Sequence, residues 1–363
     1  MDELRLASRL IAIDSSSPTG VADVMAVVAG ELTDRGVAFE RREVIGRPCL
    51  IARAGGGPIK VILHAHVDVV PGRPDQFHPR LDGGRLVGRG AYDMKAALAV
   101  MIGLMGTLGP DLGCEVELVV VPDEERADPS INCTEVLAKD GMRADLVICG
   151  EPTDLCVGVQ SKGLLLLQAT MRGVAAHGST PWAGRNAILD GVDAVRSLVD
   201  LPFMEATSAR YDRPSVNLGR IAGGSAVNSV ADTCVLELDV RILPGQCPEA
   251  VVAEIRGAAD WEIDVRLDWP PADVDPDHPL VAHVLTAARA VSSSATAVGR
   301  DGTSDAVAFQ AHGVPAIEFG PLGGGHHGPD EYVDVDGLLA YRHALGDALA
   351  RVGAHATSSA VRG

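Results

Sequence analysis

The sequence predicts an α/β protein in which helices cover a mostly parallel central sheet, with a smaller α+β domain inserted into it. Two observations indicate this class. Short apolar runs typical of buried strands alternate with segments whose apolar residues recur at helical spacing. The chain also has 363 residues, which exceeds the usual size of one compact core and suggests two domains.

Each element of this alternating pattern follows from its local sequence. The opening stretch, MDELRLASRLIAIDSS, is expected to form an amphipathic helix. Four apolar runs are expected to form buried strands: KVILHAHVDVV (60–70), EVELVVV (115–121), DLVIC (145–149) and PAIEFG (315–320). Helical spacing marks three further segments: DMKAALAVMIGLMGTL (93–108), NAILDGVDAVRSLVD (186–200) and HPLVAHVLTAARAV (278–291).

The pattern changes between residues 161 and 274. Here the apolar stretches resemble longer, half-exposed antiparallel strands: GLLLLQATMRG (163–173), SVNLGRIAGG (215–224) and CVLELDVRI (234–242). The proline-rich segment DWPPADVDPDHP (268–279) is expected to be a linker. The sequence therefore predicts a discontinuous main domain, residues 1–160 and 275–363, interrupted by an α+β domain at 161–274.

Composition and charge argue against several kinds of partner. The formal net charge is −18, so neither nucleic acid nor an anionic membrane is expected to bind. No apolar run reaches membrane-spanning length, and no secretory leader is recognisable. The seven cysteines form no CxxC pair and are expected to be reduced thiols of a cytoplasmic protein.

One predicted strand, LHAHVDVVP, carries three ionisable residues on a single face. His64, His66 and Asp68 alternate with apolar residues, and alternate residues of a strand share a face. Burying such groups without partners costs roughly several kcal/mol of folding free energy. We expect His64 to be a packing residue or a residue that supports a ligand without binding metal itself, and His66 and Asp68 to belong to a polar site.

Further polar residues follow the ends of the other predicted strands. Ligands of open α/β sheets bind at the carboxyl ends of the strands, so these side chains are expected to converge there. Each motif alone has an ordinary structural explanation, such as a helix N-cap for Asp93. Together, however, the motifs predict a site for a pair of divalent cations. Mixed histidine and carboxylate ligands suit zinc best, with cobalt or manganese as alternatives. The candidate residues are His66, Asp68, Asp93, Glu124, Glu125, Glu151 and His327.

The motifs HVDVVP, GRGAYDMK, DEE, GEPT and HGPDEYV, in this order, resemble those of the co-catalytic dizinc amidohydrolases. That family includes acetylornithine deacetylase, succinyl-diaminopimelate desuccinylase, aminoacylase, and related dipeptidases and carboxypeptidases. The resemblance covers nearly the whole chain.

The resemblance implies a role for each candidate residue. His66 and Glu151 would bind separate metal ions that share Asp93 as a bridge, with Glu125 on one ion and His327 on the other. Two such ions lower the pKa of a bridging water and generate the attacking hydroxide. Glu124 would be the general base. Asp68 would hold His66 in the correct tautomer and orientation.

The inserted domain resembles the family's lid, which commonly forms the interface of a homodimer. In RGVAAHGSTPWAGRNAI, His177 would reach the substrate carbonyl, in cis or in trans. In AVNSVADTCVLELDVR, Asn228 and Arg241 would hold the substrate carboxylate, although a surface salt bridge is an equal explanation for Arg241. The loop DGTSDA would also bind this carboxylate, through Gly302, Thr303 and Ser304, although a helix N-cap by Thr303 or Ser304 is the structural alternative.

The expected reaction is hydrolysis of the amide bond of an N-acyl amino acid, by a deacetylase or desuccinylase. A metallo-exopeptidase of the same fold, acting on a dipeptide or a carboxy-terminal residue, is the main alternative. A non-catalytic binding protein is a more remote one. The GTSD loop favours desuccinylases and peptidases, but the sequence does not identify the acyl group or the amino acid.

Overall fold

A computed structural model of the chain describes residues 2–125 and 131–360. The chain divides into two compact units. The first comprises Met1–Val159, Val274–Val298 and Ser304–Gly363, and the second comprises Gln160–Asp273 and Gly299–Thr303. The α/β class predicted from the sequence is confirmed.

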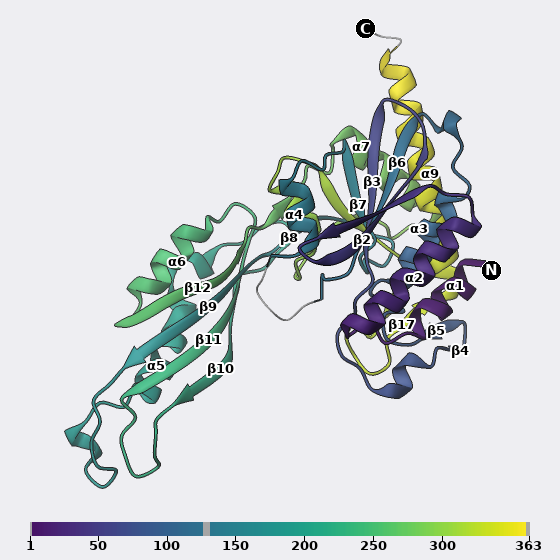
Figure 1. Cartoon of the computed structure of the whole chain (residues 1–363). Coiled ribbons are helices and arrows are strands. Elements are labelled where there is room, and N and C mark those ends of the chain that lie inside the picture. The colour runs from purple at the N-terminus through teal and green to yellow at the C-terminus, as the bar shows by residue number, and fades with distance from the viewer. Residues whose placement is uncertain (1, 126–130, 361–363) are drawn as a thin grey trace. The chain divides into compact units, whose positions relative to one another are not determined.

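A nine-stranded mixed sheet forms the centre of the fold (Figure 1). Its order is β1-β2-β6-β3-β7-β15-β8-β13, and β14 pairs with β8. The four strands β6, β3, β7 and β15 are mutually parallel, and antiparallel strands flank them on both sides. The strands are β1 (Phe39–Val44), β2 (Arg47–Gly55), β3 (Ile59–His66), β6 (Cys114–Val121), β7 (Leu146–Cys149), β8 (Val157–Ser161), β13 (Ala272–Asp273), β14 (Ala297–Arg300) and β15 (Ala316–Phe319).

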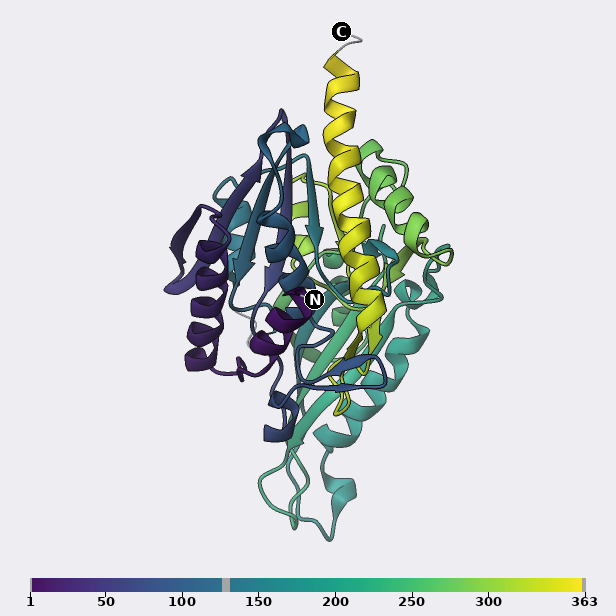
Figure 2. The same cartoon turned by 90° about the vertical axis from the view of Figure 1, so that its right-hand side faces the viewer.

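Helices cover both faces of this sheet. Five pack on one face through the larger apolar core: α1 (Asp2–Ile11), α2 (Pro18–Asp34), α3 (Lys95–Met105), α7 (Pro279–Val291) and α9 (Val335–Ala360). Two shorter helices pack on the other face: α4 (Cys133–Lys139) and α8 (Ala306–Gln310). Figure 2 shows α9, in yellow, running beside α7.

The parallel strands are apolar on both faces because both faces are covered. In β3, Val61 and Leu63 belong to the larger core, whereas Ile62 belongs to the smaller core under α4 and α8. His64 and His66 follow Ile62 at alternate positions and therefore lie on the smaller-core side. This arrangement explains the continuous apolar runs from which the strands were predicted.

A small sheet of the order β16-β17-β5-β4 completes the first unit. It consists of β4 (Arg80–Asp82), β5 (Arg85–Val87), β16 (Gly323–Gly324) and β17 (Tyr332–Asp334). Its pairing brings the glycine-rich segment near residue 90 close to the segment near residue 327, since Tyr332 pairs with Val87. Short 3₁₀ helices lie at Pro74–Phe77 and Pro110–Leu112.

The second unit is a four-stranded antiparallel sheet with two helices. Its order is β10-β11-β9-β12, and it consists of β9 (Gly163–Arg172), β10 (Ser215–Gly223), β11 (Thr233–Ile242), β12 (Trp261–Trp269), α5 (Ala187–Ser197) and α6 (Pro248–Gly257). Short 3₁₀ helices lie at Pro181–Ala183, Leu198–Asp200 and Pro202–Glu205.

Three local predictions differ from the structure. The strand expected over residues 60–70 ends at His66, so Asp68 follows the strand and is not part of it. The segment 268–279 is expected to be a linker, but β12 continues to Trp269 and β13 occupies Ala272–Asp273. The helix expected from Asp93 begins at Lys95. Among the described residues, none of the helices combines the length and the apolar character needed to cross a membrane.

Candidate metal centre

The predicted ligands lie at the ends of neighbouring parallel strands. His66 is the last residue of β3 and pairs with Val121, the last residue of β6. Glu124 and Glu125 follow β6, and Glu151 follows β7. Because these strands are parallel neighbours, their carboxyl ends share one edge of the sheet. The sheet therefore brings together side chains from three separate segments of the chain.

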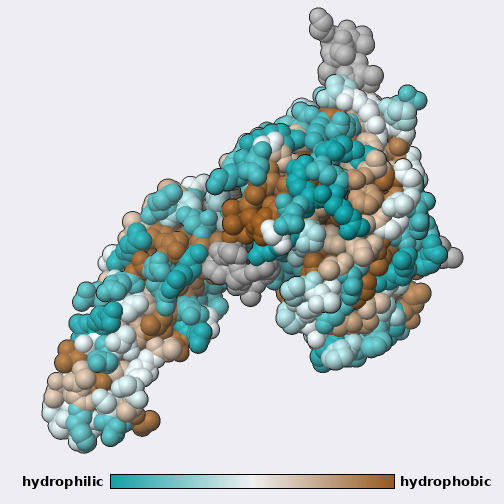
Figure 3. Space-filling view, in the orientation of Figure 1, coloured by the Kyte–Doolittle hydropathy of each residue, from teal (hydrophilic) through white to brown (hydrophobic). Residues whose placement is uncertain are grey.

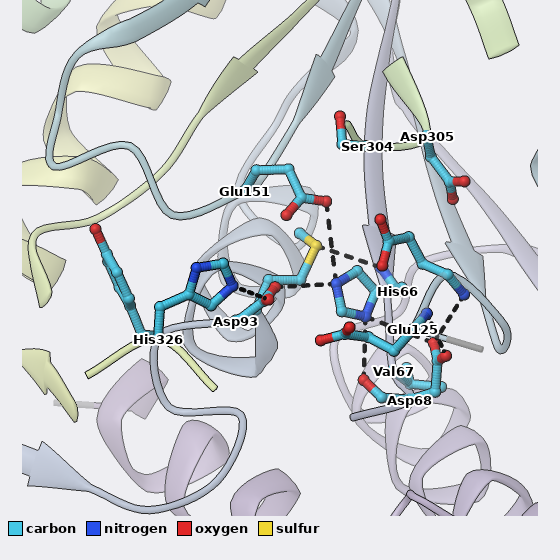
Figure 4. Close-up of polar contacts among 12 residues, drawn as sticks. His66, Val67, Asp68, Asp93, Glu125, Glu151, Ser304, Asp305 and His326 are labelled. Atoms are coloured by element: carbon cyan, nitrogen blue, oxygen red, sulfur yellow. Dashed lines mark hydrogen bonds and ion pairs between the residues drawn. The ribbon is translucent and has the colours of Figure 1, made fainter. Parts of the chain in front are cut away.

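Asp93 lies at the centre of the group, in the loop before α3 (Figure 4). Its Oδ1 is 3.1 Å from the Nε2 atom of His66. Its Oδ2 is 3.2 Å from the Nε2 atom of His327, and this same nitrogen is 2.8 Å from the Oε1 atom of Glu125. One carboxylate thus faces two histidines with its two oxygens, which is the arrangement of a bridging ligand.

The two sides of Asp93 favour a different division of ligands from the one that the resemblance implies. Glu151 lies on the Oδ1 side, with its Oε1 atom 4.0 Å from the Nε2 atom of His66. Glu125 lies on the Oδ2 side, in contact with His327. Asp93, His66 and Glu151 form one candidate ligand group, which favours His66 and Glu151 on the same ion, and the division of ligands between the ions stays a prediction.

Asp68 holds two parts of the centre at once. The Nδ1 atom of His66 is 3.1 Å from the backbone carbonyl oxygen of Asp68 and 3.5 Å from its carboxylate oxygen Oδ1. The carboxylate also accepts hydrogen bonds from the backbone N–H groups of Glu124 and Glu125, at 3.2 and 2.8 Å. Asp68 therefore orients both the histidine and the segment that carries the glutamate pair.

The electrostatics of the described residues fit divalent cations. Burial raises the pKa of the Glu151 carboxyl well above its usual range, and its Oε1 atom is buried without a hydrogen-bond partner. Hydrogen bonds to Asp93 and Glu125 raise the pKa of His327 to about 10. Burial favours a raised pKa for Asp93, but hydrogen bonds from the neighbouring histidines hold it well below its usual range. Imidazoles gathered among buried carboxylates are the donor set that a divalent cation needs.

A buried ion pair connects the loop that carries Asp93 to the loop that carries His327. This pair was not predicted from the sequence. The Nη1 atom of Arg89 lies 2.6 Å from the Oε2 atom of Glu331. The other oxygen of Glu331 accepts hydrogen bonds from the backbone N–H groups of Tyr92 and Asp93, and Arg89 also donates to the carbonyl oxygen of His327. Both residues lie within the quoted motifs, GRGAYDMK and HGPDEYV, so the signal was present.

A second histidine, His326, also reaches Asp93. Its Nε2 atom is 2.7 Å from the Oδ2 atom of Asp93, and its ring lies beside that of His327 with the centroids 4.2 Å apart. Figure 4 shows the ring directed at the carboxylate. The doublet in GGGHHGPDE was the available signal, but only His327 matched the family motif.

The expected packing role of His64 agrees with its surroundings. Burial lowers its pKa to about 3, so the ring is neutral. Its Nε2 atom is 2.9 Å from the hydroxyl of Thr134, which in turn donates to Asp305. Ser304, expected to contact substrate, is buried and donates to Glu318 at 2.7 Å.

The remaining predicted substrate residues belong to the second unit. His177 forms a bridge with Ser229, and the N–H of Gly178 donates to the carbonyl oxygen of Asn228 at 2.7 Å, so His177 and Asn228 are neighbours. Arg241 is bound to Asp239 through two contacts of 2.7 and 3.0 Å. Gly302 and Thr303 lie in the short segment Gly299–Thr303 of the same unit. Their contacts with substrate stay a prediction.

The chain is similar to a known protein family and to several solved structures. Residues 62–351 match the model of the peptidase family M20/M25/M40. A succinyl-diaminopimelate desuccinylase of Methylobacterium radiotolerans is 30% identical over 92% of this chain and 93% of its own length. A tripeptidase of Staphylococcus aureus has a TM-score of 0.80 at 20% identity, covering 97% of this chain and 98% of its own. An M20 family metallo-carboxypeptidase of Sulfolobus solfataricus has a TM-score of 0.79 at 18% identity, covering 98% and 100%.

Proposed function

The chain belongs to the peptidase family M20/M25/M40 and is a hydrolase of amide or peptide bonds, and we propose that it removes the acyl group of an N-acyl amino acid. The observation that carries this proposal is the cluster of histidine and carboxylate ligands on both oxygens of Asp93. The full-length relative at 30% identity is a desuccinylase, which supports an acyl-amino-acid substrate over a longer peptide.

We propose zinc as the metal, because mixed imidazole and carboxylate ligands suit it, with cobalt or manganese as substitutes. One ion would be held by His66, Asp93 and Glu151, and the other by Asp93, Glu125 and His327. When bound, the ions supply Lewis acidity for the scissile carbonyl and lower the pKa of the attacking water.

Glu124 is the proposed general base. Its carboxylate lies within the group formed with His66 and Glu125, yet the structure records no hydrogen bond or ion pair for this carboxylate with any described residue. Burial raises its pKa well above the usual range, which moves it towards the working pH of a proton acceptor. Glu125, by contrast, is occupied by His327. Glu124 would accept a proton from water and then deliver it to the leaving nitrogen.

The second unit is the proposed lid and dimerisation domain. His177 would donate to the substrate carbonyl, while Asn228, Arg241 and the loop carrying Gly302, Thr303 and Ser304 would bind the substrate carboxylate. Exposed large apolar side chains support an interface here; apolar surface of this unit is visible in Figure 3, and the exposed residues are Val174, Trp182, Leu189, Val199, Ile221 and Val227. The scattered cysteines support a cytoplasmic location.

A metallo-exopeptidase is the second candidate function. It is supported by the tripeptidase and the metallo-carboxypeptidase that share this fold. It differs from the first proposal in the group on the acyl side of the scissile bond, which would be an amino acid.

A substrate panel tests the proposal. Metal-reconstituted protein is assayed against N-acetyl and N-succinyl amino acids and against dipeptides and tripeptides, each with and without a chelator. We expect hydrolysis of an N-acyl amino acid that the chelator abolishes and that added zinc, cobalt or manganese restores. Cleavage of peptides alone would favour the exopeptidase. Full activity of metal-free protein would contradict both proposals.

A further inference from the structure

The loop between β16 and β17 presents two consecutive histidines to one carboxylate oxygen, and the family motif accounts for only one of them. The Nε2 atom of His326 is 2.7 Å from the Oδ2 atom of Asp93, closer than the 3.2 Å of His327. We propose that His326 is an additional metal ligand, on the ion shared by Asp93, Glu125 and His327. This inference rests on the proposed metal-dependent function.

The distances within the group support a shared ion. Two ligand atoms bound tetrahedrally to zinc, each at about 2.0–2.2 Å, lie roughly 3.3 Å apart. The separations from Asp93 to His326 and to His327, and from His327 to Glu125, are 2.7, 3.2 and 2.8 Å. A small outward movement of each side chain would admit a cation between them.

The loop geometry orients both rings before any ion arrives. Arg89 donates to the carbonyl oxygen of His327, and Gln76 donates to that of Gly328, both at 3.0 Å. Gly328 donates to Gly325, which has a φ of 69° and where an added Cβ would lie 2.6 Å from a backbone oxygen. The backbone of the loop is therefore fixed on both sides of the histidine pair.

The surroundings of His326 favour a ligand over a packing residue. Its side chain is 44% exposed, so it contributes little to an apolar core. Its ring lies edge-on to Tyr92 with the centroids 6.2 Å apart, a contact that a phenyl ring would also make. What a phenyl ring lacks is the nitrogen directed at Asp93.

The additional ligand would make the two metal sites unequal. One ion would have two imidazoles and two carboxylates, from His326, His327, Asp93 and Glu125, whereas the other would have the single imidazole of His66. Imidazole ligands favour zinc, and carboxylate ligands favour manganese. The site with two histidines would therefore bind zinc more tightly and discriminate more strongly against manganese.

The test replaces the nitrogen and keeps the ring. His326→Phe, His326→Cys and the wild type are stripped of metal and titrated with Zn²⁺ against a chromophoric chelator. His343→Phe, which removes an exposed histidine of α9, is the matched control. Thermal melting of the metal-free proteins identifies any variant that fails to fold, and the visible spectrum of the Co²⁺ forms reports the ligands independently.

We expect the wild type and His343→Phe to bind two ions, and His326→Phe to bind one of them at least about 100-fold more weakly, since loss of even an indirect partner costs 10–100-fold. His326→Cys should retain the second ion, because a thiolate is itself a zinc ligand. A folded His326→Phe protein with wild-type zinc affinity and an unchanged Co²⁺ spectrum would overturn the inference alone. A wild type that binds no ion would overturn the proposed function with it.

Discussion

Arg89 and Glu331 form a buried ion pair of 2.6 Å between segments far apart in the sequence. Their side chains are 4% and 1% exposed, so neither charge has solvent as an alternative partner. The pair joins the loop that carries Asp93 to the loop that carries His327, because Glu331 accepts from the N–H of Asp93 and Arg89 donates to His327. The separation between these two ligands therefore depends on a contact outside the ligand set.

Replacement of Arg89 by Met should destabilise the protein by about 3–5 kcal/mol, since it leaves the Glu331 carboxylate buried without its counter-charge. Zinc affinity should fall as well, because the loop with His327 loses an anchor. Urea unfolding and zinc titration measure the two effects. Arg89→Lys keeps the positive charge but not the paired N–H donors of the guanidinium group. It should therefore restore stability more fully than metal affinity. Unchanged zinc affinity in the Met variant would show that the pair does not position the ligands.

The adjacent glutamates should respond differently to the same substitution. Glu124→Ala should reduce turnover about 10²–10⁴-fold, the usual contribution of a general base, while metal content stays close to that of the wild type. Glu125→Ala should lose metal, because its carboxylate faces His327 at 2.8 Å. Metal analysis after gel filtration, combined with kcat, separates the two roles. Equal metal loss in both variants would reverse the assignment.

His177 should matter for turnover and not for metal binding. A donor placed at a developing oxyanion contributes about 10²–10³-fold to turnover. His177→Ala should therefore fold, dimerise and bind both ions, yet hydrolyse slowly. Its Nδ1 atom is 2.8 Å from the hydroxyl of Ser179, so Ser179→Ala should give a smaller loss by freeing the ring. Wild-type turnover of His177→Ala would show that His177 does not contribute to the active site.

Mixed dimers distinguish a trans role of His177 from a cis role. A Glu124→Ala chain retains His177, and a His177→Ala chain retains the proposed base. If His177 serves the partner's site, refolding the two variants together should regenerate one complete site per heterodimer. The reference is each variant refolded alone. Purified heterodimers that are no more active than these references would exclude the trans arrangement.

Lys95 should make stability depend on pH in alkaline solution. Its Nζ atom is buried and donates to the carbonyl oxygens of Leu10 and Ile13, at 3.0 and 2.8 Å. Burial lowers its pKa to about 7, whereas a lysine of the unfolded chain titrates near 10.4. Between these values the unfolded state holds one more proton, so the free energy of unfolding rises with pH, by at most about 1.4 kcal/mol per unit.

Lys95→Met removes this titration. The stability of the wild type relative to the variant should therefore increase from pH 7 towards pH 10, and stay level below pH 7. Urea unfolding of both proteins at several pH values measures the difference. A constant difference over that window would mean that the amine stays charged in the folded protein.

The sequence predicted most of the buried strands because their side chains face two apolar layers. It also predicted that His66 and Asp68 belong to a polar site, since the strand period alone places them on one face. Glu124, Glu125 and Glu151 followed from their positions after apolar runs. These inferences need only local pattern and the rule that parallel strands end at a common edge.

The features that were not predicted from the sequence depend on contacts between distant segments, which local pattern does not encode. The division of ligands between the two oxygens of Asp93 depends on how two loops approach it, and so does the proximity of His326. The ion pair of Arg89 with Glu331 depends on the pairing of β5 with β17. The strand β12 was mistaken in part for a linker because charged residues alternate with its apolar ones and prolines follow it.

The pairing of β8 with β13 has a consequence for the ancestry of the protein. Ser161 pairs with Ala272, and Gln160 pairs with Asp273, so the chain leaves and re-enters the sheet on adjacent strands. Residues 162–271 are, topologically, one long hairpin loop, and the entropy of closing a loop grows only slowly with its length. A single genetic insertion or deletion at this place can add or remove the whole segment without rethreading any strand. All the candidate metal ligands lie outside it, so the specificity of such an enzyme can diversify by exchange of this segment while the hydrolytic centre is inherited unchanged.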